Sequence, residues 1–184
     1  MAKTRLDGLR KLVAADSDPK ITPITEVVAM RDEIMKAEAI ARVVHYGQTF
    51  QNEIEKGQPF IAHPQAVAES VDITLKSAAW LHDVIEDSEG YVTAGHLLAA
   101  GISPSTVEVV EILTRRDGEE TYTEYIERIA SSGNMGAIVL KLADLAHNRR
   151  PSCPESLVER YRDATYRLTL ALPSTRTSSP AVTP

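Results

Sequence analysis

Residues Ser77–Asp87 read SAAWLHDVIED, an apolar run that is interrupted by a cluster of polar side chains. The first half is apolar on nearly every face of a helix, which predicts a helix buried in a protein core. The second half nevertheless carries His82 and Asp83 side by side, followed by Glu86 and Asp87. Burying a carboxylate without a partner costs considerable free energy. The run therefore predicts a metal ion, a cation or a hydrogen-bond network beside this helix.

Helical geometry brings these four side chains together. In a continuous helix, residues four apart share a face, so Glu86 lies one turn beyond His82, and Asp87 lies one turn beyond Asp83. Because His82 and Asp83 differ by about 100° around the axis, both can reach one ion just outside the helix. For Glu86 and Asp87 the alternative is a solvated acidic helix end, since the chain continues as Ser-Glu-Gly.

A second apolar helical pattern, Ala137–Asn148 (AIVLKLADLAHN), also carries charged side chains. It is interrupted by Lys141 and Asp144 before it reaches His147 and Asn148, and Asn148 follows Asp144 at i+4 on the same face. The alternative to a functional role is that Lys141 and Asp144 pair with each other at i+3.

A third segment, Gly57–Pro64 (GQPFIAHP), places His63 directly before a proline that can start a helix. Alone, His63 is more readily explained as a cap or a packed histidine than as a ligand. Together the three segments supply two imidazoles and two carboxylates as candidate metal ligands: His63, His82, Asp83 and Asp144. Structural zinc sites prefer cysteine, and Cys153 is the only one in the chain. Mixed imidazole and carboxylate ligands favour one Mn²⁺, with Fe²⁺ or Zn²⁺ as alternatives.

The rest of the chain predicts an all-α fold, a single-domain helical bundle. Apolar residues recur at helical spacing over 27–44 and 122–129, and period-2 alternation is rare. Ser103-Pro104 and the Thr121/Glu124 pair are typical helix starts, and Ser152 with Glu155 is expected to cap a helix from about 155 to 172. We expect an N-terminal extension over 1–25 with a short helix near residues 9–15, one domain over 26–172, and a disordered tail over 173–184.

Composition excludes several function classes. The 184 residues suit one soluble domain, and a net charge of −6 argues against an extended nucleic-acid surface. No apolar stretch suits a signal peptide or a membrane span, and a single cysteine fits a reducing compartment. These features predict a cytoplasmic protein with no membrane partner.

The sequence resembles the HD-domain superfamily and, within it, the RelA/SpoT-type hydrolase domains and small alarmone hydrolases. Four runs carry the resemblance, in the family's order, across roughly residues 37–150: HYGQ at 45–48, PFIAHP at 59–64, WLHDVIED at 80–87 and KLADLAHN at 141–148. An HD pair alone is weakly specific, whereas the four runs together are strongly specific.

The resemblance implies a role for each matching residue. It implies that His63, His82, Asp83 and Asp144 bind one Mn²⁺, that Glu86 and Asp87 position and activate the attacking water, and that Asn148 contacts the substrate. His45 is interpreted as structural, and His96 and His147 as solvated surface residues. Lys56 and Lys141 are further candidates for substrate binding, and Arg115, Arg116, Arg149 and Arg150 for balancing phosphoryl charge.

The sequence departs from the family pattern at two places. The family's guanine-packing arginine has no counterpart in Asn52–Lys56 (NEIEK), where Lys56 is the only cation. Pro151 stands where the family has a substrate-contacting threonine. These two departures therefore argue against a strong specificity for guanine.

The function implied is Mn²⁺-dependent hydrolysis of the 3′-diphosphate of (p)ppGpp-like alarmone nucleotides, which releases pyrophosphate. One alternative is an HD phosphohydrolase acting on another nucleotide or on a pyrophosphorylated RNA end. The other is an antitoxin-like protein that neutralises a partner alarmone synthetase, acting as the toxin, through its helical surface.

Overall fold

The computed structural model describes residues 23–52 and 54–173, and over these ranges the fold is helical. The only β contact within them is an isolated bridge between Thr49 and Pro59. The helices, in chain order, are α2 (Ile24–Val44), α3 (Ala62–Ser70), the 3₁₀ turn η2 (Ile73–Leu75), α4 (Lys76–Leu81), α5 (Val84–Asp87), α6 (Ala94–Ala99), α7 (Pro104–Leu113), α8 (Tyr122–Ser131), α9 (Met135–Asn148) and α10 (Glu155–Ala171). The predicted all-α class is confirmed for this part of the chain.

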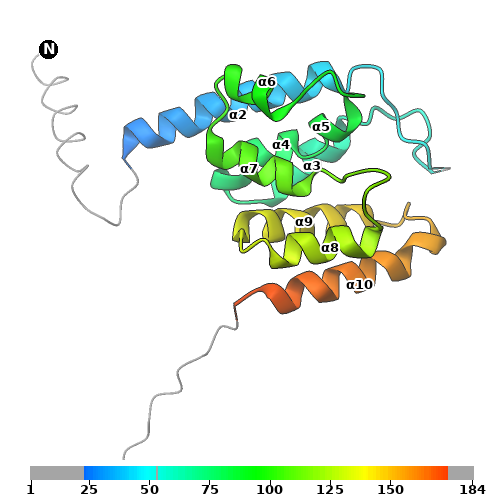
Figure 1. Ribbon diagram of the computed structural model, residues 1–184. Coiled ribbons are helices and arrows are strands. Elements are labelled where there is room, and N and C mark those ends of the chain that lie inside the picture. Colours follow the sequence, from blue (N-terminus) through cyan, green and yellow to red (C-terminus); the bar gives the residue numbers. More distant parts are fainter. Residues whose placement is uncertain (1–22, 53, 174–184) are drawn as a thin grey trace, which may run out of the picture.

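The helices form two packed groups (Figure 1). In the first group α4 is central, because it packs against α2, α3 and α7. In the second group α8, α9 and α10 pack against one another, and α9 also contacts α3 and α7. The helix α3 thus touches both α4 and α9, which brings the three polar segments of the sequence to one place.

Large aliphatic side chains from both groups are buried in the core. Leu81, at the end of α4, and Leu140 and Leu145, on α9, are fully buried. Complete burial of one such side chain stabilises the fold by about 1.5–3 kcal/mol. His82 and Asp144 follow or precede these leucines directly in sequence, so the packing that buries the leucines also fixes the polar residues beside them.

The expected helix starts at Ser103 and Thr121 are confirmed. The hydroxyl of Ser103 accepts a hydrogen bond from the backbone of Thr106, and Pro104 opens α7. Thr121 and Glu124 form the capping box that opens α8. These local signals operate within one turn of the chain, which is why the sequence alone identifies them.

Two expectations about helix ends are wrong. The helix α10 has the expected bounds to within a residue, but it follows Pro154 without a side-chain cap, and Ser152 is buried instead. The chain over 77–87 is two helices, α4 and α5, that meet at His82 and Asp83. Nδ1 of His82 donates a hydrogen bond to the backbone carbonyl of Ala79 at 2.7 Å. In a continuous α-helix, that carbonyl would accept from the backbone N–H of Asp83.

The expected short helix near residues 9–15 and the expected disorder of the tail from 174 onward lie outside the described residues. The predicted domain boundaries therefore stay predictions. Among the described helices, none combines the length and the apolar character that a membrane span requires.

Candidate metal centre and catalytic pocket

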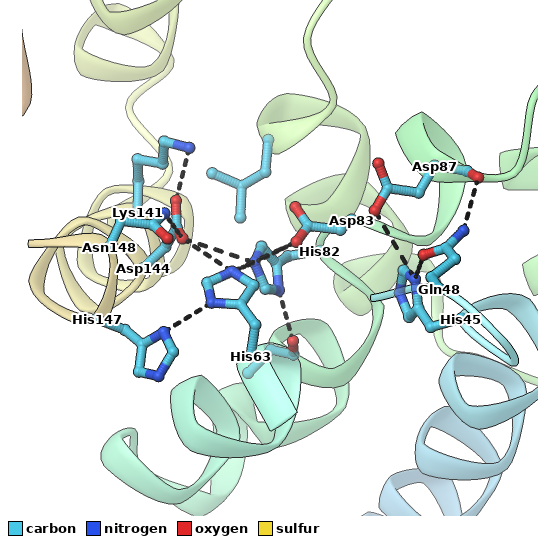
Figure 2. A network of polar contacts seen from close by, with 12 residues as sticks. His45, Gln48, His63, His82, Asp83, Asp87, Lys141, Asp144, His147 and Asn148 are labelled. Carbon is cyan, nitrogen blue, oxygen red and sulfur yellow. Dashed lines mark hydrogen bonds and ion pairs between the residues drawn. The ribbon is translucent and has the colours of Figure 1, made fainter. Parts of the chain in front are cut away.

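Three of the four expected ligands converge at the junction of α3, α4 and α9 (Figure 2). Nε2 of His63 lies 3.1 Å from Nε2 of His82 and 3.2 Å from Oδ1 of Asp144. One donor atom from each of these three buried residues lies within 4.8 Å of the others. Ligands about 2.1 Å from a common ion are about 3.0–3.5 Å apart, which matches these two spacings. The third spacing, from Nε2 of His82 to Oδ1 of Asp144, is longer at 3.8 Å.

The fourth expected ligand, Asp83, lies beside the same imidazoles. Its Oδ2 is 3.1 Å from Nε2 of His82 and 3.4 Å from Nε2 of His63. The break between α4 and α5 turns the Asp83 carboxylate toward these imidazoles (Figure 2). The structure thus brings together all four residues that the sequence singled out as ligands.

The Asp144 carboxylate is held by neighbours on its own helix. Nζ of Lys141 donates to Oδ2 at 2.7 Å, and Nδ2 of Asn148 donates to Oδ1 at 2.6 Å. The i+3 ion pair considered as the alternative reading of Lys141 is therefore present, and it coexists with the cluster. Lys141 and Asn148, both expected to bind substrate, line the pocket around the candidate ligands, but their polar groups are bonded to Asp144.

The electrostatics of the cluster favour charged carboxylates. Burial opposes ionisation of Asp144, but the Lys141 ammonium and the imidazole of His63 outweigh it and hold its pKa below the usual range. Burial likewise disfavours a charged His63, but its hydrogen bonds to Asp144 and Asp83 raise the pKa to about 9. The carboxylates are thus held in their charged form, which is the form that a cation-binding site requires.

Glu86 and Asp87 lie close to the cluster but in different surroundings. Glu86 lines the same pocket as the ligands, and its Oε2 accepts a hydrogen bond from the backbone of Arg115 at 3.1 Å. The side chain of Glu86 reaches solvent, but partial burial of its carboxyl group raises its pKa. The nearby negative charge of Asp83 adds to this effect. A carboxylate with a raised pKa is suited to accept a proton near neutral pH.

Asp87 faces a neighbouring hollow instead. The buried His45 lies 3.7 Å from its carboxylate and 2.7 Å from Oε1 of Gln48, and Nε2 of Gln48 donates to the Asp87 carbonyl (Figure 2). These contacts join His45 to Gln48 and Asp87, and its structural role stays a prediction.

The pocket around the ligands measures about 230 Å³. The residues that line the pocket but were not placed there by the sequence include Tyr122, which fits the apolar pattern of a helix, and Arg115, one of four arginines considered for balancing phosphoryl charge. Within the described residues, Oη of Tyr122 and Nε of Arg115 are buried without a hydrogen-bond partner, although Nε of Arg115 is 3.6 Å from Asp117. The apolar period of α8 concealed Tyr122, because a tyrosine satisfies that period whether or not its hydroxyl reaches a pocket.

Three further residues considered in the sequence analysis do not line the metal pocket. Lys56 is exposed and does not line the metal pocket. His96 is exposed, as expected. His147, expected on a solvated surface, is half-buried, and its Nδ1 lies 2.8 Å from Nδ1 of His63. The sequence correctly predicts the helix α9, but it does not show that α3 packs against this helix.

Comparison with known proteins gives a consistent result. No protein-family model matches the chain. The chain is 33% identical over 127 residues to the bifunctional (p)ppGpp synthase/hydrolase SpoT of Escherichia coli strain K12, an alignment that covers 64% of this chain and 18% of SpoT. It is 33% identical over 132 residues to the guanosine-3′,5′-bis(diphosphate) 3′-pyrophosphohydrolase of Vibrio cholerae, covering 65% of this chain and 18% of that protein. The chain thus spans about a fifth of the length of these curated relatives.

A solved structure of a metazoan ortholog of SpoT, described as hydrolysing ppGpp, superposes with a TM-score of 0.61 at 21% identity. The match covers 78% of this chain and 86% of that one, and it shows a common fold. The resemblance predicted from the four sequence runs is thereby confirmed: over about two thirds of its length the chain is similar in sequence to a segment of the SpoT-type ppGpp pyrophosphohydrolases, and it shares the fold of the SpoT ortholog.

Proposed function

We propose that this chain is a metal-dependent phosphohydrolase that removes the 3′-diphosphate of ppGpp-like alarmone nucleotides as pyrophosphate. The observation that carries the proposal is the meeting of His63, His82 and Asp144, from three separate segments, with donor atoms at metal-ligand spacing. The sequence similarity to ppGpp 3′-pyrophosphohydrolases supports the substrate class.

His63, His82, Asp83 and Asp144 would hold the cation. Two imidazoles with two carboxylates suit Mn²⁺, and Fe²⁺ or Zn²⁺ would also be accepted. Such a cation supplies Lewis acidity toward a phosphoryl oxygen and lowers the pKa of a water molecule.

The roles of the surrounding residues follow from their positions. Glu86 lines the ligand pocket with a raised pKa, so its carboxylate would orient the attacking water and accept its proton. Asp87 contacts His45 and Gln48, and it would fix the wall of the second hollow beside the metal pocket. Arg115 also lines the pocket, and its guanidinium would neutralise charge on the phosphoryl oxygens. Asn148 would contact the substrate beside Asp144, to which its amide is already bonded.

A second hollow of about 510 Å³ offers room for the nucleoside. It is lined by residues 47–51, Phe60 and Asp87, and it shares Phe60 with the metal pocket. A nucleotide would therefore lie across Phe60, with its phosphates toward the candidate ligands and its base in the second hollow. A ring can stack on an aromatic side chain whichever base it belongs to.

We further propose that the chain discriminates weakly between guanine and adenine alarmones. The described part of the loop between Gln48 and Gly57 contains no arginine, and Lys56, its cation, is exposed. A lysine does not reproduce the planar stacking of a guanidinium on a base.

The test is turnover of ppGpp and ppApp by purified, Mn²⁺-loaded protein, with release of pyrophosphate as the readout. We expect both to be hydrolysed, with kcat/KM values within about a hundredfold, or about 2.7 kcal/mol. A larger preference for ppGpp would contradict the weak discrimination. No turnover of either nucleotide would contradict the proposed activity and favour the antitoxin-like alternative.

A further inference from the structure

His147 is the residue whose surroundings the proposed chemistry leaves unexplained. Its Nδ1 lies 2.8 Å from Nδ1 of His63, and the two ring centroids are 4.9 Å apart (Figure 2). Two ring nitrogens at this distance share one hydrogen, so one must donate and the other must accept.

Arg150 decides which nitrogen accepts. Its Nη1 lies 3.2 Å from the same Nδ1 of His147, and a guanidinium has only donors. Nδ1 of His147 is therefore the acceptor toward Arg150, and its proton belongs on Nε2. It follows that Nδ1 of His63 donates to His147.

Arg150 is itself fixed by the loop that precedes α3. Its Nε donates to Oε1 of Glu55 at 2.9 Å, and its guanidinium lies 4.9 Å from the centroid of Phe50. Nη1 also donates to the backbone carbonyl of His147 at 3.0 Å. A continuous set of contacts thus runs from Glu55 through Arg150 and His147 to His63.

Histidines that bind metals almost always donate their second ring N–H to a fixed acceptor, which sets the tautomer and the ring orientation. His82 does so through Nδ1 to the carbonyl of Ala79 at 2.7 Å. For His63, the corresponding acceptor is Nδ1 of His147.

We propose that His147 is a positioning residue that holds His63 in the tautomer with its lone pair on Nε2 once Nε2 binds a metal ion, and that Arg150 keeps His147 in the accepting tautomer. This inference rests on the proposed metal centre. It assigns the proton of each ring and adds a role that the four ligands alone do not imply.

The experiment measures the dissociation constant for Mn²⁺ by equilibrium dialysis of metal-free protein, so that it does not depend on turnover. Loss of a residue that orients a metal ligand typically costs about 10–100-fold in metal affinity, and we expect His147→Leu to weaken Mn²⁺ binding by about that factor. His147→Asn should recover most of the affinity, because its amide oxygen can accept near the position of Nδ1. His96→Leu, at an exposed histidine, is the matched control and should bind as the unmodified protein does.

Thermal melts without metal separate a positioning effect from general destabilisation. Weak Mn²⁺ binding by a normally folded His147→Leu, with recovery in His147→Asn, supports the inference. Unchanged affinity in His147→Leu overturns it. Absence of Mn²⁺ binding by the unmodified protein would instead overturn the metal centre, and hence the proposed function.

Nitrogen-15 NMR of the unmodified protein gives an independent test that needs no variant. The inference requires His147 to carry its proton on Nε2 and to present Nδ1 as an unprotonated acceptor. A His147 protonated at Nδ1 would contradict it.

Discussion

Nζ of Lys141 donates to Oδ2 of Asp144 at 2.7 Å, while Oδ1 of the same carboxylate lies 3.2 Å from Nε2 of His63. The Asp144 carboxylate thus contacts the Lys141 ammonium through one oxygen and the candidate metal ligand His63 through the other. Lys141 also lies 5.0 Å from the centroid of the Tyr125 ring, which adds a cation–π contact. Its ammonium is therefore fixed by the protein before any substrate arrives.

We expect Lys141→Met to lower the free energy of unfolding of metal-free protein by about 2–3 kcal/mol, because it leaves Asp144 buried with fewer partners. Arg162→Met removes another i,i+3 ion pair, with Glu159, whose side chains are both exposed, and should cost less than about 1 kcal/mol. Urea unfolding of both variants provides the comparison. Equal effects would show that Asp144 does not depend on Lys141.

Asp144→Asn should lose bound metal and activity together, since an amide oxygen is a much weaker ligand than a carboxylate for a divalent cation. Asp163→Asn, on the exposed face of α10, should keep both. Elemental analysis after dialysis against Mn²⁺ measures the metal content. Full occupancy and full turnover in Asp144→Asn would remove this residue from the ligand set.

Glu86→Gln is expected to keep the metal but to lose turnover by about 10²–10⁴-fold, the usual contribution of a general acid or base. Glutamine can still accept the hydrogen bond from the Arg115 backbone, so the local structure should persist. Steady-state kinetics with metal content determined in the same sample provide the test. A loss of less than about tenfold would transfer the proton-accepting role away from Glu86.

Arg115→Gln should reduce kcat/KM by about 10–100-fold, the scale of a lost charge-assisted hydrogen bond of about 1.5–3 kcal/mol. The matched control is Arg116→Gln, because Arg116 adjoins Arg115 but is exposed and does not line the metal pocket. Similar losses in the two variants would indicate general electrostatic attraction rather than a specific contact.

Acid should destabilise the protein partly through Glu120. Its carboxylate accepts hydrogen bonds from Nε and Nη2 of Arg128 at 2.9 and 2.7 Å, and this contact lowers its pKa from 4.5 to about 2. Because the folded-state pKa is depressed, the stabilisation is complete above about pH 4.5 and is lost as the pH falls toward 2.

Over that window the unmodified protein should lose more unfolding free energy than Glu120→Gln, by at most about 3 kcal/mol. Urea unfolding at pH 5 and at pH 2.5 measures this difference. Parallel pH dependence in the two proteins would show that the Arg128 contact does not perturb Glu120.

Much of the fold was accessible from sequence because its signals are local. The apolar periods of α2, α8 and α9 follow from the 3.6-residue repeat, and the starts of α7 and α8 follow from capping within one turn. The break at His82–Asp83 was not accessible, because it reflects a side-chain hydrogen bond from His82 to Ala79 that competes with the helix backbone.

For the proposed metal centre, the sequence alone identified the candidate ligands. A buried apolar helix does not tolerate His82, Asp83 or Asp144 without a partner, and this cost is visible in the order of residues alone. Sequence could not determine which partners satisfy each group, because hydrogen bonds between helices depend on how those helices approach. The packing of α3 against both α4 and α9 places His63 between His82 and His147. That approach, made by residues 84 positions apart in the chain, turned an expected surface histidine into a neighbour of the metal ligands.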